Sequence, residues 1–235
     1  MYPKSARYYD TIYAFKDYAK EAECLHALIL EHKRTDGVRL LDVACGTGNH
    51  LAYLKDHYNV EGIDVDGDML TIARRKHPDL PFHQGDMVDF DLGRQFDVVT
   101  CLFSSIGYVE TVQKLEQAMG NIARHLEKGG LLVLEPWLAP EDYKPNTVHA
   151  TFVDEPELKI ARINTSLVEN NVSILDFHHL VGTPDGVEYF VERHTLYLFN
   201  DEEYQHALVQ AGFEVMYDQE GLSGRGLYLG IKSQS

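Results

Sequence analysis

A glycine-rich turn between an apolar run and a helical segment constrains this chain more than any other feature. Val38–Val43 predicts a short buried strand, which ends in Ala44-Cys-Gly-Thr-Gly-Asn49 before a helix-like segment over His50–Lys55. Glycines at such a junction let a ligand approach the backbone closely. The turn therefore predicts a nucleotide-like ligand.

The alternation of apolar runs and amphipathic segments continues along the chain. Asn59–Asp64 predicts a strand and Gly67–His77 a helix that Pro78 stops. Further strands are expected over 80–84, 96–102 and 131–135, and further helices over 16–33 and about 111–127, the second closed by Gly129-Gly130. Strands that alternate with helices indicate an α/β fold, with a parallel sheet covered on both faces.

From Pro136 to Phe199 the pattern changes to segments rich in β-branched and aromatic residues. They predict antiparallel strands over 159–168, 172–181 and 187–198. A helix over 201–211, capped by Asp201 or Asn200, and strands over 213–217 and 226–231 then return to the first pattern. We expect one main domain of residues 1–136 and 200–235 with an antiparallel β insertion of residues 137–199, where substrate specificity would reside.

Charge and composition narrow the possible partners. The chain carries 21 Lys and Arg against 37 Asp and Glu, a net charge of -16, so its field repels nucleic acid and anionic membranes. Three cysteines without C-x-x-C spacing and 12 histidines without ligand spacing predict neither disulfides nor a metal site. With no apolar signal or membrane-spanning run either, we expect a soluble, cytoplasmic protein.

Acidic residues end the strands that follow the glycine turn. Asp64 closes its strand where a carboxylate can accept both hydroxyls of a ribose. Asp86 follows the next strand and could accept from an adenine amino group, while Met87 packs on the ring. Leu51 stands where a dinucleotide fingerprint has its third glycine, which disfavours a pyrophosphate and a nicotinamide dehydrogenase. The strand ends together predict an adenosine site.

These motifs resemble those of class I S-adenosylmethionine-dependent methyltransferases, which have a Rossmann-like sheet. A longer set of segments is similar to the TDP-3-amino-sugar N,N-dimethyltransferases of macrolide sugar pathways, the desosamine and mycaminose type: Leu41-Asp-Val-Ala-Cys-Gly-Thr-Gly48, His83-Gln-Gly-Asp-Met87, Phe103-Ser-Ser-Ile-Gly-Tyr108, Glu135-Pro-Trp137 and Ser223-Gly-Arg-Gly-Leu227. The resemblance runs from about Tyr9 to Ile231. It implies S-adenosylmethionine as cofactor, two successive methylations of an amine on a nucleotide-linked sugar, and a homodimer that uses the insertion for substrate binding and assembly.

The resemblance also implies a cofactor site. An N-terminal segment would fold over the cofactor, with Tyr9 and Tyr18 reaching its methionine carboxylate; ordinary packing of these tyrosines is the alternative. The glycine turn and the strand ends would supply the rest. The candidate cofactor residues are Tyr9, Tyr18, Ala44, Gly46, Gly48, Asp64, Val65, Met69, Asp86, Met87 and Phe103.

Methyl transfer needs alignment, exclusion of water and an uncharged nucleophile more than acid–base groups. Tyr108, just beyond the fourth strand, could orient the amine or relay its proton, although some members of the family have histidine there and packing alone is an alternative. His178 and His179 are adjacent in a strand and must face opposite ways. The resemblance favours His178 as the second catalytic candidate, and a structural role is the alternative.

Arg225 lies between two glycines and is the best candidate for a diphosphate clamp, because its guanidinium can bind in bidentate fashion. Trp137 could stack on a sugar or base. The substrate candidates are Ser105, Trp137, Arg162, His194 and Arg225. Two other hypotheses stay open: a methyltransferase of a free small amine or carboxylate, and a non-catalytic module that senses the cofactor.

Overall fold

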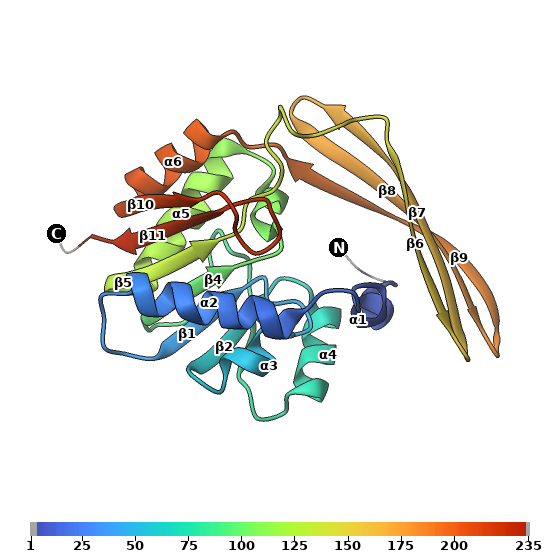
Figure 1. Ribbon diagram of the computed structural model, residues 1–235, viewed down its shortest axis with the longest axis horizontal. Helices are drawn as coiled ribbons and strands as arrows, with labels where there is room; N and C mark the ends of the chain where they lie inside the picture. Colours follow the sequence, from blue (N-terminus) through green and yellow to red (C-terminus); the bar gives the residue numbers. More distant parts are fainter. Residues whose placement is uncertain (1–3, 234–235) are drawn as a thin grey trace.

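The computed structural model describes residues 4–233, which form two sheets (Figure 1). The larger sheet has the strand order β10-β11-β5-β4-β1-β2-β3. Strands β1 to β5 are parallel, and β11 runs antiparallel to both β5 and β10. The bounds are Arg39–Val43 (β1), Asn59–Asp64 (β2), Phe82–Gln84 (β3), Phe96–Cys101 (β4), Leu126–Leu134 (β5), Phe213–Asp218 (β10) and Leu227–Lys232 (β11).

Helices cover both faces of this sheet, which confirms the predicted fold class. One face carries α2 (Tyr18–His32), α3 (Leu51–Leu54) and α4 (Gly67–Lys76); the other carries α5 (Val112–Arg124) and α6 (Asp201–Gln210). Successive strand residues point to opposite faces of the sheet. Leu40 therefore packs in the core beneath α2, α3 and α4, and Leu41 in the core beneath α5 and α6. The cap of α6 is Asn200, which forms a capping box with Glu203.

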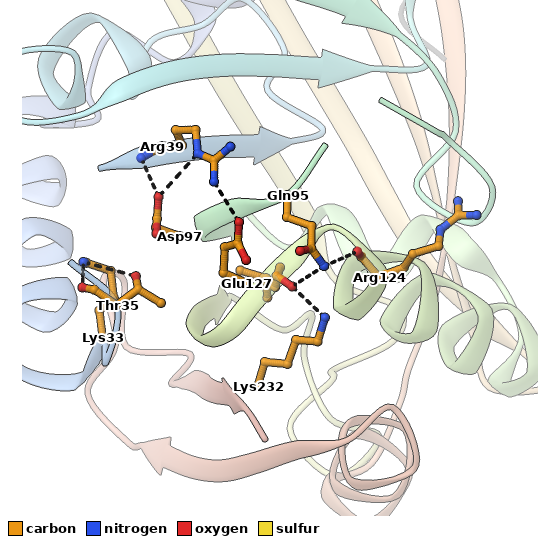
Figure 2. A network of polar contacts seen from close by, with 9 residues as sticks. Lys33, Thr35, Arg39, Gln95, Asp97, Arg124, Glu127 and Lys232 are labelled. Carbon is orange, nitrogen blue, oxygen red and sulfur yellow. Dashed lines mark hydrogen bonds and ion pairs between the residues drawn. The ribbon is translucent and has the colours of Figure 1, made fainter. Parts of the chain in front are cut away.

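The end of α5 differs from the sequence-based expectation. The helix stops at Arg124 and β5 begins at Leu126, so the glycine pair 129–130 lies inside a strand. Figure 2 shows why this early end is stable: the Gln95 amide donates to the carbonyl oxygens of Arg124 and Leu126, and Lys232 Nζ donates to that of Leu126. The carbonyl group of Arg124, the last residue of the helix, is thus satisfied by a side chain. The predicted closure at Gly129-Gly130 was wrong, because the chain is already in β5 at these glycines.

The second sheet is antiparallel, with the order β6-β7-β8-β9. It consists of Val148–Glu155 (β6), Leu158–Glu169 (β7), Val172–Thr183 (β8) and Gly186–Tyr197 (β9). Three of these strands match the predicted ones; β6, an edge strand with many polar residues, was not anticipated. In Figure 1 this sheet stands beside the main sheet, with the N-terminal helix α1 (Tyr9–Ile12) between them.

The N-terminal segment joins the two sheets. Ile12 packs against Ile160, Val181 and Phe190 of the second sheet. On its other side, the Asp10 carboxylate accepts hydrogen bonds from Thr47 Oγ1 (2.6 Å), Asn49 Nδ2 (3.0 Å) and Lys76 Nζ (2.6 Å), which belong to the glycine turn and to α4. The segment therefore spans the space above the carboxyl ends of the parallel strands.

Within residues 4–233, no helix combines the length and apolar character that crossing a membrane requires.

Candidate active site

A cavity of about 630 Å³ opens at the carboxyl ends of the parallel strands, between the main sheet, the N-terminal segment and the second sheet. Its size suits a small-molecule site. The glycine turn, the strand ends, the 3₁₀ helix η2 (Ser105–Val109) and the inner face of β8 and β9 supply the walls. The expected residues that line it are Tyr9, Ala44, Gly46, Asp64, Val65, Met69, Asp86, Met87, Phe103, Ser105, Tyr108, Trp137 and Arg225.

The backbone is strained where β1 and β4 end at this cavity. Ala44, Phe103 and Ser104 adopt positive φ angles of 58°, 53° and 61°. For residues with a side chain, such conformations cost on the order of 1–3 kcal/mol each and persist only where neighbours hold them. Here Phe103 N donates to Glu135 Oε2 (2.6 Å), and Ser104 Oγ donates to the Pro136 carbonyl oxygen (2.8 Å).

One end of the cavity carries the two strand-end carboxylates. Asp64 accepts from the backbone N–H groups of Gly46 (2.7 Å) and Asp66 (2.9 Å), and its burial raises the pKa of its carboxyl. Asp86 accepts from Val88 N (3.1 Å). Met69 and Met87 supply apolar surface beside them. Two carboxylates set in apolar surroundings can receive the hydroxyls and amino group of an adenosine.

Two expected cofactor residues lie elsewhere. Gly48 does not line the cavity: its φ is 78°, and a Cβ there would lie 3.1 Å from the Phe82 ring and 3.2 Å from His77, so this glycine permits packing of the turn. Tyr18 lines an adjoining cavity of about 40 Å³ instead, where burial raises the pKa of its phenol to about 12.

Aromatic side chains of the N-terminal segment form the roof of the cavity. The Tyr13 ring lies 4.7 Å from that of Tyr9 and meets Phe103 edge-on at 5.2 Å. Lys16, which sequence reasoning missed, pairs with Glu21 at 2.7 Å and places its ammonium 4.2 Å from the Phe103 ring centroid. No local sequence pattern marks Lys16, because its role depends on how the segment folds back.

Another part of the cavity wall carries the cation of Arg225. Arg225 Nη1 donates to Ser104 Oγ (2.7 Å), and its guanidinium lies 5.8 Å from the Phe103 ring and 5.7 Å from the Trp137 ring. Leu175, Phe177 and Leu196 complete this wall from β8 and β9. The two-residue period of a strand could have identified them once the strand bounds and inner face were known.

The remaining candidates are Tyr108, in η2, and His194 and Arg162, which lie at the border of the cavity. Tyr108 Oη is 2.7 Å from His194 Nδ1, and burial lowers the pKa of His194 to about 4. With Arg162, His194 lines a cavity of only about 10 Å³ that adjoins the large one. Arg162 donates to Tyr13 Oη (2.9 Å) and stacks on Phe177 at 4.9 Å. These two candidates therefore border the site through Tyr108 and Tyr13 rather than lining it.

His178 lies outside the candidate site of this chain. It is exposed on the outer face of the second sheet, where Nδ1 is 2.6 Å from Tyr189 Oη. Its neighbour His179 faces inward and is buried, because successive strand residues alternate between faces. Among residues 4–233, no three His, Cys, Asp or Glu side chains gather in a way that could hold a metal ion.

Comparison with known proteins identifies close relatives. Residues 40–130 match the family model of a methyltransferase domain. The dTDP-3-amino-3,6-dideoxy-alpha-D-glucopyranose N,N-dimethyltransferase of Streptomyces fradiae is 42% identical over 230 residues, which cover 96% of this chain and 90% of that protein. The dTDP-4-amino-2,3,4,6-tetradeoxy-D-glucose N,N-dimethyltransferase of Saccharopolyspora spinosa is 38% identical over 234 residues, covering 98% and 94%.

Solved structures match over the whole architecture, including the second sheet. DesVI from Streptomyces venezuelae superposes with a TM-score of 0.92 at 40% identity, covering 98% of this chain and 99% of that one. CalS10 from Micromonospora echinaspora, an amino pentose methyltransferase solved with S-adenosylmethionine bound, superposes with a TM-score of 0.87 at 37% identity, covering 96% of both chains.

The buried residue Asp42, at the end of β1, should make the stability of the fold depend on pH. It accepts from Thr100 Oγ1 (2.7 Å), and burial raises its pKa from an ordinary 3.8 to about 6. The folded state therefore favours the protonated form, and the stability that this contributes below pH 4 is lost as the pH rises through 6. Asp42→Asn should be more stable than the wild type at pH 7 by roughly 2–3 kcal/mol, and equally stable near pH 4.

Thermal unfolding at both pH values measures this difference, with the exposed Asp36→Asn as the control that should show none. An Asp42→Asn variant that is less stable than the wild type at pH 7 would show that the ionised carboxylate stabilises the fold.

Proposed function

Since the chain belongs to the class I S-adenosylmethionine-dependent methyltransferases, and within them to the dTDP-amino-sugar N,N-dimethyltransferases, we propose that it methylates the amine of a TDP-linked 3-amino-deoxy sugar twice. The enzyme uses S-adenosylmethionine as methyl donor. The observation that carries the substrate proposal is the continuous cavity that joins Asp64 and Asp86 at one end to Trp137 and Arg225 at the other. A relative that acts on a 3-amino sugar, at 42% identity, supports the position of the amine.

The strand-end residues fit the cofactor. Asp64 would accept the ribose hydroxyls, Asp86 the adenine amino group, and Val65, Met69 and Met87 would pack around the adenine. Ala44 and Gly46 would pass close to the methionine part, below the roof of Tyr9. When bound there, the cofactor supplies an electrophilic methyl group next to the acceptor end of the cavity.

Arg225 would bind the diphosphate of the substrate. A chain of net charge -16 repels a free dianion, so local cations must overcome the overall field. The Ser104 hydroxyl and the Phe103 and Trp137 rings hold the guanidinium at the cavity wall, which reduces the cost of ordering it. Ser105 and Trp137 would contact the sugar or base, while Arg162 and His194 would support this end from the adjoining small cavity.

Tyr108 would contact the sugar amine. The amine must be unprotonated to attack, and the largely apolar lining of the cavity and the nearby sulfonium would both disfavour a second positive charge. In each transfer an N–C bond would form as the methyl group leaves the sulfur of its donor, and the nitrogen would then release one proton to solvent. Alignment and exclusion of water would supply most of the rate enhancement.

The insertion, residues 137–199, would have two roles. Its inner face forms the acceptor wall, and its outer face carries a group of exposed apolar side chains: Phe152, Ile163, Leu180, Tyr189 and Val191. The strand register places Phe152, Ala161, Leu180 and Tyr189 in one row across the sheet. Such a contiguous apolar face is typical of a protein interface, so the enzyme would form a homodimer through it.

Mass spectrometry of the products tests the substrate. With S-adenosylmethionine, a TDP-3-amino-3,6-dideoxyhexose should gain one and then two methyl groups, while its 3-hydroxy analogue gains none. The 4-amino isomer, run in parallel, tests the position of the amine. Methylation of a free small amine or a carboxylate, with no gain on any sugar nucleotide, would replace the proposed substrate class.

Replacing Arg225 tests the diphosphate site. Arg225→Ala should raise KM for the sugar nucleotide about 10- to 100-fold, the loss expected for a charge-assisted hydrogen-bonded pair, with a smaller change in kcat. For Arg225→Lys, KM should lie between the values of the wild type and Arg225→Ala, since an ammonium cannot form a bidentate contact. Arg34→Ala, which removes an exposed ion pair with Glu214, is the matched control. Equal effects on the same sugar without its nucleotide would argue against diphosphate binding.

A charge on the outer sheet face tests the dimer. Leu180→Glu should convert the protein to a monomer in light scattering coupled to gel filtration, because an unpaired carboxylate would be buried at the interface. Val209→Glu, an equally drastic change at a residue 58% exposed on α6, should leave the dimer intact. A monomeric wild type, or a dimeric Leu180→Glu variant, contradicts this assembly.

A further inference from the structure

We propose that His194 is a positioning residue: it holds the hydroxyl hydrogen of Tyr108 away from the cavity, so that the phenol oxygen meets the sugar amine as an acceptor only. The inference rests on the proposed function and states how the same site orients its nucleophile.

The two side chains meet between η2 and β9. Tyr108 lines the large cavity, whereas His194 is buried behind it, and Oη and Nδ1 are 2.7 Å apart. The two rings are 5.9 Å apart at an angle of 62°. Phe177 packs edge-on against the imidazole at 5.1 Å and 80°, which limits rotation of the ring. The hydrogen bond therefore joins a side chain that lines the cavity to an imidazole that is buried and held by packing.

The backbone brings them together. A Cβ on Gly107 would lie 3.1 Å from side-chain atoms of both Leu196 and Trp137, so η2 reaches β9 this closely only because residue 107 is a glycine. One residue from His194, Thr195 Oγ1 donates to Glu110 Oε1 (2.8 Å) and ties β9 to the end of η2. Contacts on both sides of the pair thus maintain its geometry.

Chemistry gives the direction of the hydrogen bond. A phenol is a stronger donor than a neutral imidazole N–H, and an imidazole nitrogen is a stronger acceptor than a phenol oxygen. Because burial lowers the pKa of His194 to about 4, the ring is neutral at pH 7 and carries one unprotonated nitrogen, which can accept a hydrogen bond. Tyr108 therefore donates to Nδ1, and the ring proton resides on Nε2.

This direction matters for attack by an amine. A hydroxyl that pointed its hydrogen at the substrate would bind the nitrogen lone pair, which is the pair that must form the N–C bond. An oxygen that only accepts binds an N–H instead and leaves the lone pair free to face the methyl group. The arrangement serves both transfers, since a primary amine has two N–H groups and a monomethylated amine retains one.

Kinetics of matched variants tests the role of His194. Methionine and glutamine have similar length, but only glutamine offers a strong acceptor to the Tyr108 hydroxyl. His194→Met should lower kcat about 10- to 100-fold with little change in KM for the sugar nucleotide, whereas His194→Gln should retain most of kcat. Tyr108→Phe combined with His194→Met should be faster than His194→Met alone, because it removes the misdirected hydroxyl.

Equal losses of kcat in His194→Met and His194→Gln, or a double variant with a lower kcat than His194→Met, would overturn the proposal. Thermal unfolding and S-adenosylhomocysteine binding of each variant identify any loss that comes from the fold. Turnover by the wild type in the same assay tests the proposed function separately.

The tautomer can be read without substrate. In wild-type protein labelled with ¹⁵N-histidine, the His194 signals, assigned by their absence from His194→Gln, should show a protonated Nε2 and an unprotonated Nδ1. A protonated Nδ1 would mean that the imidazole donates to the phenol, and would overturn the proposal whatever the kinetics show. This measurement needs neither a stable methionine variant nor an identified sugar.

Discussion

The part of the site around Phe103 and Arg225 depends on two hydrogen bonds to the buried carboxylate of Glu135. It lies at the end of β5, accepts from Phe103 N and from Ser223 Oγ, both at 2.6 Å, and is 1% exposed. A buried carboxylate without partners is very unfavourable, so both donors are strongly held. Through them one side chain joins the strained end of β4 to the loop that carries Arg225. The Phe103 ring and the Arg225 guanidinium, 5.8 Å apart, are thereby positioned by the same carboxylate.

The N-terminal segment covers another side of the cavity and is likewise held by buried and half-buried carboxylates. Asp10 accepts from the glycine turn and α4, while Ser5 N donates to Glu192 of β9 at 3.0 Å, so both sheets hold the same short stretch of chain. Its aromatic side chains Tyr9, Tyr13 and Phe15 line the cavity from this side. Under the proposed function this cover would contribute to the chemistry, because methyl transfer is accelerated mainly by alignment and dehydration.

Charge is distributed unevenly around the cavity. Carboxylates of Glu21, Asp64 and Asp86 line the end proposed for the cofactor, which is a cation, and the acidic chain as a whole reinforces their field. Arg225 stands at the other end, where a diphosphate would lie. Lys16 also lines the cavity, but its ammonium is paired with Glu21 at 2.7 Å, so Asp64 and Asp86 would face the cationic donor and Arg225 the anionic acceptor.

The sequence by itself determined the main sheet and the positions of Asp64 and Asp86. Hydrophobic period and turn residues are local, and parallel strands bring their carboxyl ends to one edge whatever the rest does. Only the tertiary structure decided that Gly48 serves packing, that His178 faces outward, and that Tyr108 meets His194, 86 residues away. These outcomes depend on strand register and on which elements pack together, and such long-range contacts leave no trace in local spacing.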